Sequence, residues 1–216
     1  MQIAFLLYPD MTALDAVGPY EVLARLPAAD VKFVATVPGP IATDVGMVLT
    51  ADSGLDDVPS PDVIVVPGGP GTLPALEDTA AVSWLRQAHE TSMWTTSVCT
   101  GSLLLGAAGV LRGKRATSHW ILRDMLSQFG AEPVAERVVI EGKVITAAGV
   151  SAGIDMALTL AAAAAGEDAA RALQLTIEYD PDPPFDSGSL EKADDETRRR
   201  ATALMVPGGE EAQATA

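Results

Sequence analysis

Cys99 is the only cysteine of the chain, and its neighbours suit nucleophilic chemistry. It follows an apolar run, residues 93–98, that has the length of a buried strand, and it precedes a helical run, residues 103–108. A side chain at such a joint points at the helix N-terminus, where unpaired N–H groups and the helix dipole favour an anion. We therefore expect the thiol to lose its proton more readily than a free thiol, in a nucleophile elbow with cysteine in place of serine. The alternative is a small buried hydrophobic residue, as most free cysteines are.

A glycine-rich turn is expected beside Cys99. It follows the apolar segment 63–66 and reads Pro67-Gly68-Gly69-Pro70-Gly71. The carboxyl ends of parallel strands line one ligand-binding edge of a sheet, so the turn and Cys99 should share that edge. The backbone N–H groups of Gly69 and Thr100 would then converge beside the sulfur and stabilise developing negative charge. The spacing of a nucleotide-binding loop is absent, and the alternative is a turn that needs glycine only for backbone freedom.

Asp15 is the candidate carboxylate partner of Cys99. It lies between the first apolar segment, residues 3–7, and a helix that Gly18-Pro19 is expected to open. This strand-to-helix connection belongs to the same edge of the sheet, although an aspartate there is also a common helix cap. Glu21 lies six residues further on, roughly 240° around a helix, so the two carboxylates should not serve one site. We choose Asp15 because it is nearer the loop.

The two histidines are weaker candidates for a catalytic role than Cys99 and Asp15. His119 follows a short strand and is either a base for Cys99 or a wall of its pocket. His89 falls at the polar end of a predicted helix and is expected to be solvated. Two histidines and one cysteine without a cluster predict no metal site, and no cofactor is expected. Asp155, inside an apolar helix, is expected to be structural and to have its carboxylate satisfied by buried hydrogen bonds.

Strand-like and helix-like segments alternate along the chain, which predicts parallel strands with helices on both faces. We expect one α/β domain over residues 1–190, followed at 191–216 by a charged helix and a frayed tail. The arginine run 198–200 follows three acidic residues and should form a solvated, self-paired helix face. The predicted segments are strands at 3–7, 31–37, 62–66 and 93–98, short strands or hairpins within 41–51 and 137–147, and helices near 19–26, 80–90, 152–165 and 167–178.

The composition limits the classes of partner. The chain has 216 residues, 14 basic and 29 acidic, and a formal net charge of −15. This balance opposes binding to nucleic acid or to an anionic membrane, because both need a basic surface. A single cysteine excludes an internal disulfide. The start of the chain has no basic leader and reads as a strand, so we expect a protein of the reducing cytoplasm.

The motifs together resemble the ThiJ/PfpI superfamily over about residues 1–190. The resemblance rests on the elbow from Val98 to Leu111, on Pro67-Gly68-Gly69 after a buried strand, and on the segments 14–22, 116–120, 146–155 and 177–185. It is most specific for the isonitrile-hydrating branch of the superfamily; Ser118 is a small departure, because threonine is common there. The resemblance implies a flavodoxin-like sandwich, a homodimer and working groups at Asp15, Cys99 and Thr100. Gly69 of the glycine turn and His119 are the candidate substrate-binding residues.

The chemistry implied by the resemblance is the addition of water to an isonitrile, giving an N-substituted formamide without a cofactor. Cys99 would form a thioimidate with the isonitrile carbon, and Asp15 would act as general acid and base. Thr100 would orient the water or stabilise charge. Three alternatives stay open. The first is a glyoxalase-like or amide-hydrolysing enzyme with His119 as base, and the second is a redox sensor based on Cys99 oxidation. The third is a transcription regulator, for which the acidic charge and the short stretch after residue 190 leave little room.

Overall fold

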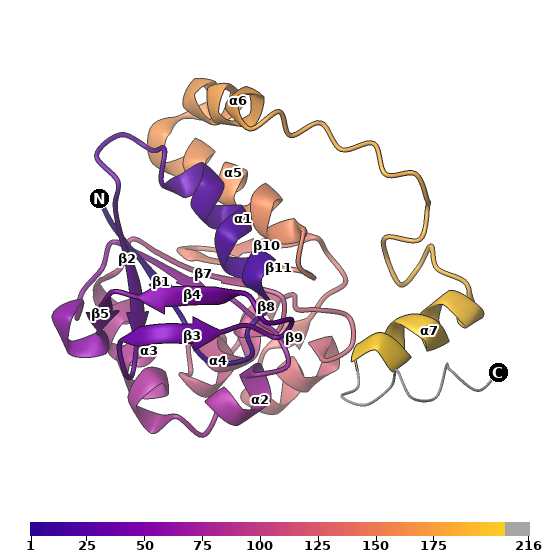
Figure 1. The fold of residues 1–216 in the computed structure, drawn as a ribbon, viewed down its shortest axis with the longest axis horizontal. Helices are drawn as coiled ribbons and strands as arrows, with labels where there is room; N and C mark the ends of the chain where they lie inside the picture. The colour runs from indigo at the N-terminus through magenta and orange to yellow at the C-terminus, as the bar shows by residue number, and fades with distance from the viewer. Residues whose placement is uncertain (206–216) are drawn as a thin grey trace. The chain divides into compact units, whose positions relative to one another are not determined.

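In the computed structural model, residues 1–205 are described, and seven of their strands form one sheet in the order β10-β11-β7-β6-β1-β2-β5 (Figure 1). All neighbours in it run parallel except β10 and β11. The four side chains of β6 are buried, as expected for a central strand covered on both faces. The strands of this sheet are β1 (Gln2–Leu6), β2 (Asp30–Ala35), β5 (Ser53–Gly54), β6 (Val63–Val66), β7 (Trp94–Val98), β10 (Val138–Glu141) and β11 (Val144–Ala147).

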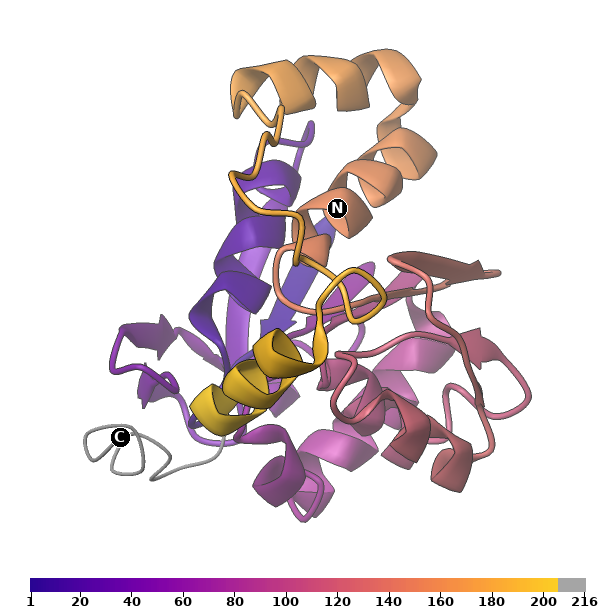
Figure 2. The same cartoon turned by 90° about the vertical axis from the view of Figure 1, so that its right-hand side faces the viewer.

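Helices cover both faces of this sheet, so the predicted α/β sandwich is confirmed. One face carries α1 (Ala13–Leu23) and α5 (Ala152–Ala165), with α6 (Glu167–Thr176) packed on α5, and the other carries α2 (Thr72–Ala75), α3 (Thr79–Thr91) and α4 (Gly101–Ala107) (Figures 1 and 2). Two small two-stranded sheets lie outside it: β3 (Gly39–Ala42) with β4 (Val48–Ala51), and β8 (Arg115–Ala116) with β9 (Glu132–Pro133). Short 3₁₀ helices occur at η1 (Leu55–Asp57) and η2 (Arg123–Phe129).

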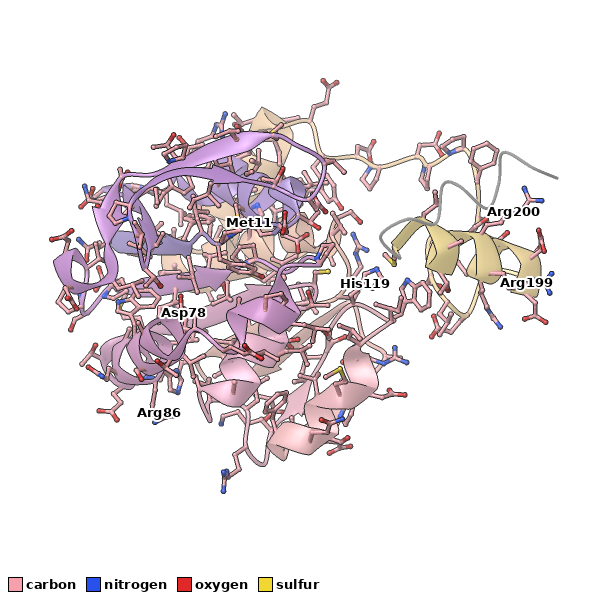
Figure 3. The ribbon with its side chains drawn as sticks, turned by 60° about the horizontal axis from the view of Figure 1, so that its bottom comes forward. Met11, Asp78, Arg86, His119, Arg199 and Arg200 are labelled. Carbon is pink, nitrogen blue, oxygen red and sulfur yellow. The ribbon has the colours of Figure 1, made fainter. Side chains whose placement is uncertain are left out.

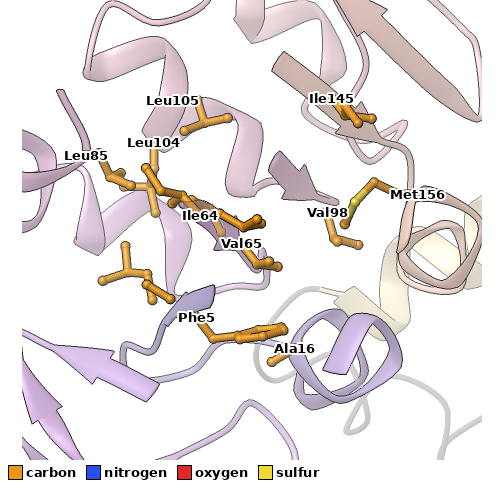
Figure 4. Packing of buried hydrophobic residues seen from close by; sticks show 14 of the residues in the cluster. Phe5, Ala16, Ile64, Val65, Leu85, Val98, Leu104, Leu105, Ile145 and Met156 are labelled. Atoms are coloured by element: carbon orange, nitrogen blue, oxygen red, sulfur yellow. The ribbon is translucent and has the colours of Figure 1, made fainter. Parts of the chain in front are cut away.

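One continuous hydrophobic core extends on both sides of the sheet. In Figure 4, Phe5 of β1 lies next to Ala16 of α1, and Val98 of β7 lies next to Met156 of α5. Leucines from α3 and α4 gather on the opposite face near Ile64. Because β7 and α4 are both anchored in this core, the Cys99 joint between them is held at a fixed place.

The start of α1 differs from the prediction. Gly18-Pro19 does not open the helix, which begins at Ala13 and contains Pro19 in its interior. The Pro19 side chain packs against the position of Gly153 in α5, where a Cβ atom would come within 3.1 Å of the ring. This close packing of α1 on α5 offsets the usual cost of a proline inside a helix. Asp15 therefore lies in the first turn of α1 and not in the loop before it.

Residues 1–178 form one compact unit, and a second unit begins at Tyr179; the predicted domain limit at residue 190 stays a prediction. In the second unit, α7 (Asp195–Met205) carries the predicted self-paired charges (Figure 3). Arg198 pairs with Asp195 at 3.1 Å, and Arg199 and Arg200 both pair with Glu196. The predicted frayed tail lies outside the described residues. Over 1–205, the longest helices are too short or too polar to cross a membrane.

Candidate active site

Cys99 forms a strained joint between β7 and α4. Its φ angle is 56°, in the left-handed region, and its side chain is buried. Such a conformation costs about 1–3 kcal/mol in a residue other than glycine, so the surroundings must impose it. The Cys99 N–H donates to the carbonyls of Ala147 (3.1 Å) and Ala148 (3.0 Å). Its carbonyl accepts from the hydroxyls of Ser118 (3.0 Å) and Ser102 (3.2 Å). These bonds hold the predicted elbow in place.

The glycine turn lies against this elbow, as predicted. A Cβ atom on Gly68 would lie 2.4 Å from the Thr100 nitrogen, and one on Gly101 would lie 2.2 Å from the Val66 oxygen. Neither distance is possible for a real side chain. Glycine at these two positions therefore lets the turn after β6 and the start of α4 approach each other closely.

Asp15 is fully buried, and the glycine turn holds one of its oxygens. The Gly68 N–H donates to Asp15 Oδ2 at 2.9 Å, whereas Oδ1 is buried without a conventional hydrogen-bond partner among the described residues. Burial raises the pKa of Asp15 to about 7, and the charge of Asp44 adds to the rise. Hydrogen bonds from Gly68 and from the Cys99 thiol lower this pKa and limit the shift. The Asp15 carboxyl and the Cys99 thiol thus lie close enough for each to shift the pKa of the other.

The ionisation of Cys99 differs from the sequence expectation. Burial and the charge of Asp15 raise the pKa of the thiol above its usual range, although hydrogen bonds from Thr100 and Val150 lower it. The expectation of an easily ionised thiol is wrong because α4 is short and the sulfur is buried next to a carboxylate. The pair therefore rests as a neutral thiol beside Asp15, which is the group that loses its proton first.

The N–H groups that face the sulfur are not the predicted pair. Gly69 N–H donates to the Thr100 hydroxyl at 2.8 Å, so it does not converge on the sulfur as expected. Its place is taken by Val150 N–H, which acts together with Thr100 N–H on Cys99. Val150 lies between β11 and α5 with a φ angle of 28°, which is rare for a β-branched residue. Nothing in the sequence marked it, except that the β11–α5 connection lies at the same edge of the sheet.

Two buried hydroxyl groups next to Thr100 were also missed. Thr72 Oγ1 lies 2.7 Å from Thr100 Oγ1, and the Tyr8 hydroxyl lies 3.0 Å from Thr72 Oγ1. The only sequence clue was that both residues follow strands at this edge, Tyr8 after β1 and Thr72 after the glycine turn. All three side chains are buried.

His119 packs near the site without a hydrogen bond to Cys99 or Asp15 among the described residues. Its ring lies so close to Gly149 that a Cβ atom there would come within 2.5 Å of it. Burial lowers the pKa of His119, so the ring is neutral near pH 7. Without such a bond the structure gives no support for His119 as a base, and its role as a wall of the pocket stays a prediction.

Glu21, His89 and Asp155 each have a partner of their own. Glu21 forms an exposed ion pair with Arg25 and stays out of the site, as expected. His89 is half-buried and not solvated, because its Nδ1 bonds to the Thr95 hydroxyl at 2.8 Å. Asp155 is structural as expected, but through a half-exposed ion pair with Arg137 rather than through buried hydrogen bonds. Among residues 1–205, no group of three or more side chains is arranged to hold a metal ion.

The arrangement can support addition of a thiol to an electrophile. Asp15 can take the Cys99 proton as the sulfur forms a bond, and the Thr100 and Val150 N–H groups face the charge that develops on it. The same carboxyl can then return the proton to the product of the addition. A buried carboxyl with a pKa near 7 can act in both directions at neutral pH.

These features define a protein with a cysteine elbow on a flavodoxin-like sandwich, and the chain belongs to the DJ-1/PfpI family. Its residues 1–163 match the sequence model of that family. The superfamily resemblance noted in the sequence is thereby confirmed.

Comparisons with individual proteins give more detail than the family match. The chain is 48% identical over 209 residues to an isonitrile hydratase from Pseudomonas putida, covering 95% of this chain and 92% of that protein. The crystal structure of a THiJ/PfpI family protein from Pseudomonas syringae superposes with a TM-score of 0.92 and 40% identity, over 99% of this chain and 89% of that one. An HTH-type transcriptional regulator from Pseudomonas aeruginosa is 32% identical, but the match covers 75% of this chain and only 50% of the regulator.

Proposed function

We propose that the protein is an isonitrile hydratase, a carbon–nitrogen lyase that adds water to an isonitrile and releases the N-substituted formamide. The observation that carries the proposal is the buried pair of Asp15 and Cys99 at the elbow. The 48% identity to the Pseudomonas putida isonitrile hydratase over nearly the whole chain supports the choice of substrate class.

In the first step, Cys99 adds to the terminal carbon of the isonitrile. Asp15 takes the thiol proton while the sulfur–carbon bond forms, and it then delivers that proton to the same carbon. The carbon–nitrogen triple bond becomes the double bond of a thioimidate, in which the carbon carries hydrogen and sulfur. The Thr100 and Val150 N–H groups stabilise negative charge on the sulfur during the attack.

In the second step, water replaces the sulfur. Asp15 removes a proton from the water as the water oxygen bonds to the thioimidate carbon, and it passes that proton to the nitrogen. The carbon–sulfur bond then breaks, the carbonyl of the formamide forms, and the remaining proton returns to Cys99. Thr100 orients the water through its hydroxyl, while Gly69 holds that hydroxyl and His119 forms part of the pocket wall.

The test is incubation with a panel of alkyl isonitriles, with formamide followed by mass spectrometry. We expect turnover by the wild type and none above background by Cys99→Ala. In Thr100→Val the second step should be slowed, so a covalent adduct with the mass of one isonitrile should accumulate on Cys99. Absence of formamide with every substrate would overturn the function, and full activity of Cys99→Ala would overturn the mechanism.

The other activities find less support in the geometry. A glyoxalase-like or hydrolytic enzyme would need His119 as a base, and His119 lies against Gly149 without a bond to Cys99. A redox sensor would need an easily ionised thiol, whereas burial raises the pKa of Cys99. The homodimer and the cytoplasmic location stay predictions; light scattering of the purified protein tests the first.

A further inference from the structure

The hydroxyl groups of Thr100, Thr72 and Tyr8 form a buried chain that ends at a carbonyl. Thr100 Oγ1 lies 2.7 Å from Thr72 Oγ1, which lies 3.0 Å from the Tyr8 hydroxyl, and that hydroxyl donates to the Pro67 carbonyl at 2.6 Å. The residues come from three places in the sequence: the loop after β1, the first turn of α2 and the elbow. Burial raises the pKa of Tyr8, so its hydroxyl keeps its proton at neutral pH.

The direction in which these three hydroxyls donate follows from the number of hydrogens that each can give. Each hydroxyl has one hydrogen to donate. The Pro67 carbonyl only accepts, so it takes the hydrogen of Tyr8. The contact between Tyr8 and Thr72 must then use the hydrogen of Thr72, and the contact between Thr72 and Thr100 must use that of Thr100. The longer contact from Thr100 to the Gly69 carbonyl, 3.2 Å, is therefore the minor one.

This direction decides whether the Thr100 hydroxyl acts in the site as a donor or as an acceptor. Its hydrogen is used toward Thr72, while the hydroxyl also lies near enough to the Cys99 sulfur to lower the pKa of the thiol. Of its two acceptor positions, one takes the Gly69 N–H at 2.8 Å and the other stays open. In the hydration proposed above, that open position can accept a hydrogen from the attacking water.

We propose that Tyr8 and Thr72 are positioning residues that hold the Thr100 hydroxyl as an acceptor for the water of the second step. The step that uses the water rests on the proposed function; the direction of the hydroxyl chain does not. Tyr8 sets this direction although it lies two hydrogen bonds away from Thr100.

The proposal predicts that loss of the Tyr8 hydroxyl reverses the direction of the hydrogen bond between Thr72 and Thr100. In Tyr8→Phe, Thr72 has no acceptor except Thr100, so its hydrogen fills the open position that the water needs. The freed hydrogen of Thr100 can then be shared between the Gly69 carbonyl, 3.2 Å away, and the Cys99 sulfur. Phenylalanine keeps the ring that lines an apolar cavity of about 270 Å³, so the change is confined to the hydroxyl. In Thr72→Val, by contrast, the acceptor position stays open.

Hydration and alkylation of Cys99 are measured in Tyr8→Phe, Thr72→Val and the double variant. We expect kcat for hydration to fall roughly tenfold to a hundredfold in Tyr8→Phe. The double variant should regain most of that loss, because it removes the hydrogen that blocks Thr100. Alkylation by iodoacetamide at fixed pH should be about tenfold faster than wild type in all three variants, the size expected for one added hydrogen bond to a thiolate.

Two matched controls carry the same chemical changes elsewhere. Tyr20→Phe alters a tyrosine that packs against Phe5 and Phe33, and Thr96→Val alters a buried threonine of β7 that bonds to the Ile64 carbonyl. Both should leave kcat and alkylation unchanged.

A double variant as slow as Tyr8→Phe, or slower, overturns the proposal, because losses of packing add and do not reverse. Wild-type hydration by Tyr8→Phe overturns it as well. If the wild type forms no formamide, the proposed function has failed, and alkylation alone decides: faster alkylation in the three variants supports the chain direction, and unchanged or slower alkylation overturns it.

Discussion

Two aspartates, Asp15 and Asp155, occupy the first turns of α1 and α5, helices that pack against each other. They differ in burial and in hydrogen-bond partners. Asp155 lies half-exposed and accepts two hydrogen bonds from the Arg137 guanidinium, at 2.6 and 2.9 Å. Asp15 is fully buried without a cation, and one of its oxygens lacks a conventional partner among the described residues. A satisfied carboxylate stabilises the fold, whereas a buried and poorly satisfied one carries a cost that a reaction can use.

The largest expected effect is on catalysis. Asp15→Asn should lower kcat/KM for isonitrile hydration by about 10²–10⁴, because Asp15 is the charged group that acts on Cys99 among the described residues and the one placed to take its proton. Asp155→Asn makes the same chemical change in the neighbouring helix and should stay within about threefold of wild type, as expected for a surface ion pair. Initial rates of formamide formation measure both. Equal losses in the two variants would end the distinction between them.

The pH dependence of kcat/KM also distinguishes Asp15 from Asp155. Asp15 must be ionised to take the thiol proton, and burial raises its pKa to about 7. We expect kcat/KM to rise about tenfold per pH unit below pH 7 and to level off above it. Asp155→Asn should show the same midpoint. A midpoint near the ordinary aspartate value of about 4 would show that the burial of Asp15 does not govern the reaction.

The smallest effect is on stability, and its sign should differ between the two sites. Because the pKa of Asp15 is higher in the folded state, its ionisation costs stability as pH rises from about 4 to about 7, and the loss is complete above pH 7. Asp15→Asn should therefore raise the free energy of unfolding at pH 8 by about 1–3 kcal/mol. The gain should shrink as pH falls and vanish below about pH 4.

Asp155→Asn should instead lower the free energy of unfolding by roughly 0.2–1 kcal/mol at neutral pH, because it removes a partly exposed ion pair. Urea unfolding at two pH values measures both variants. Stabilisation by both substitutions, or by neither, would contradict the comparison.

Much of the fold could be predicted because its cues are local. The apolar run of β6, the turn between β10 and β11, and the alanine-rich helix α5 each depend on residue types within one short segment. The start of α1 could not be predicted, since proline usually marks the first turn of a helix. There the contact between Pro19 and Gly153 of α5, a distant residue, overrides the local rule.

The candidate site divides in the same way. Cys99, Asp15 and Thr100 were chosen because each follows a strand at one edge of the sheet, and the structure brings them together. Val150 could not be found, because its importance lies in a strained backbone and an N–H group rather than in its side chain. Tyr8 and Thr72 could not be found either, since a hydroxyl chain depends on distances between separate loops.

Residue types and their order were enough to predict the class of chemistry, since a lone cysteine at a strand–helix joint, a glycine turn and an aspartate loop are local patterns. The protonation states of the site depend instead on the folded chain: a neutral thiol, a carboxyl with a pKa near 7, and N–H groups from Thr100 and Val150 facing the sulfur. The reason is physical. Burial, charge and hydrogen-bond geometry set a pKa, and none of the three exists until distant segments pack together.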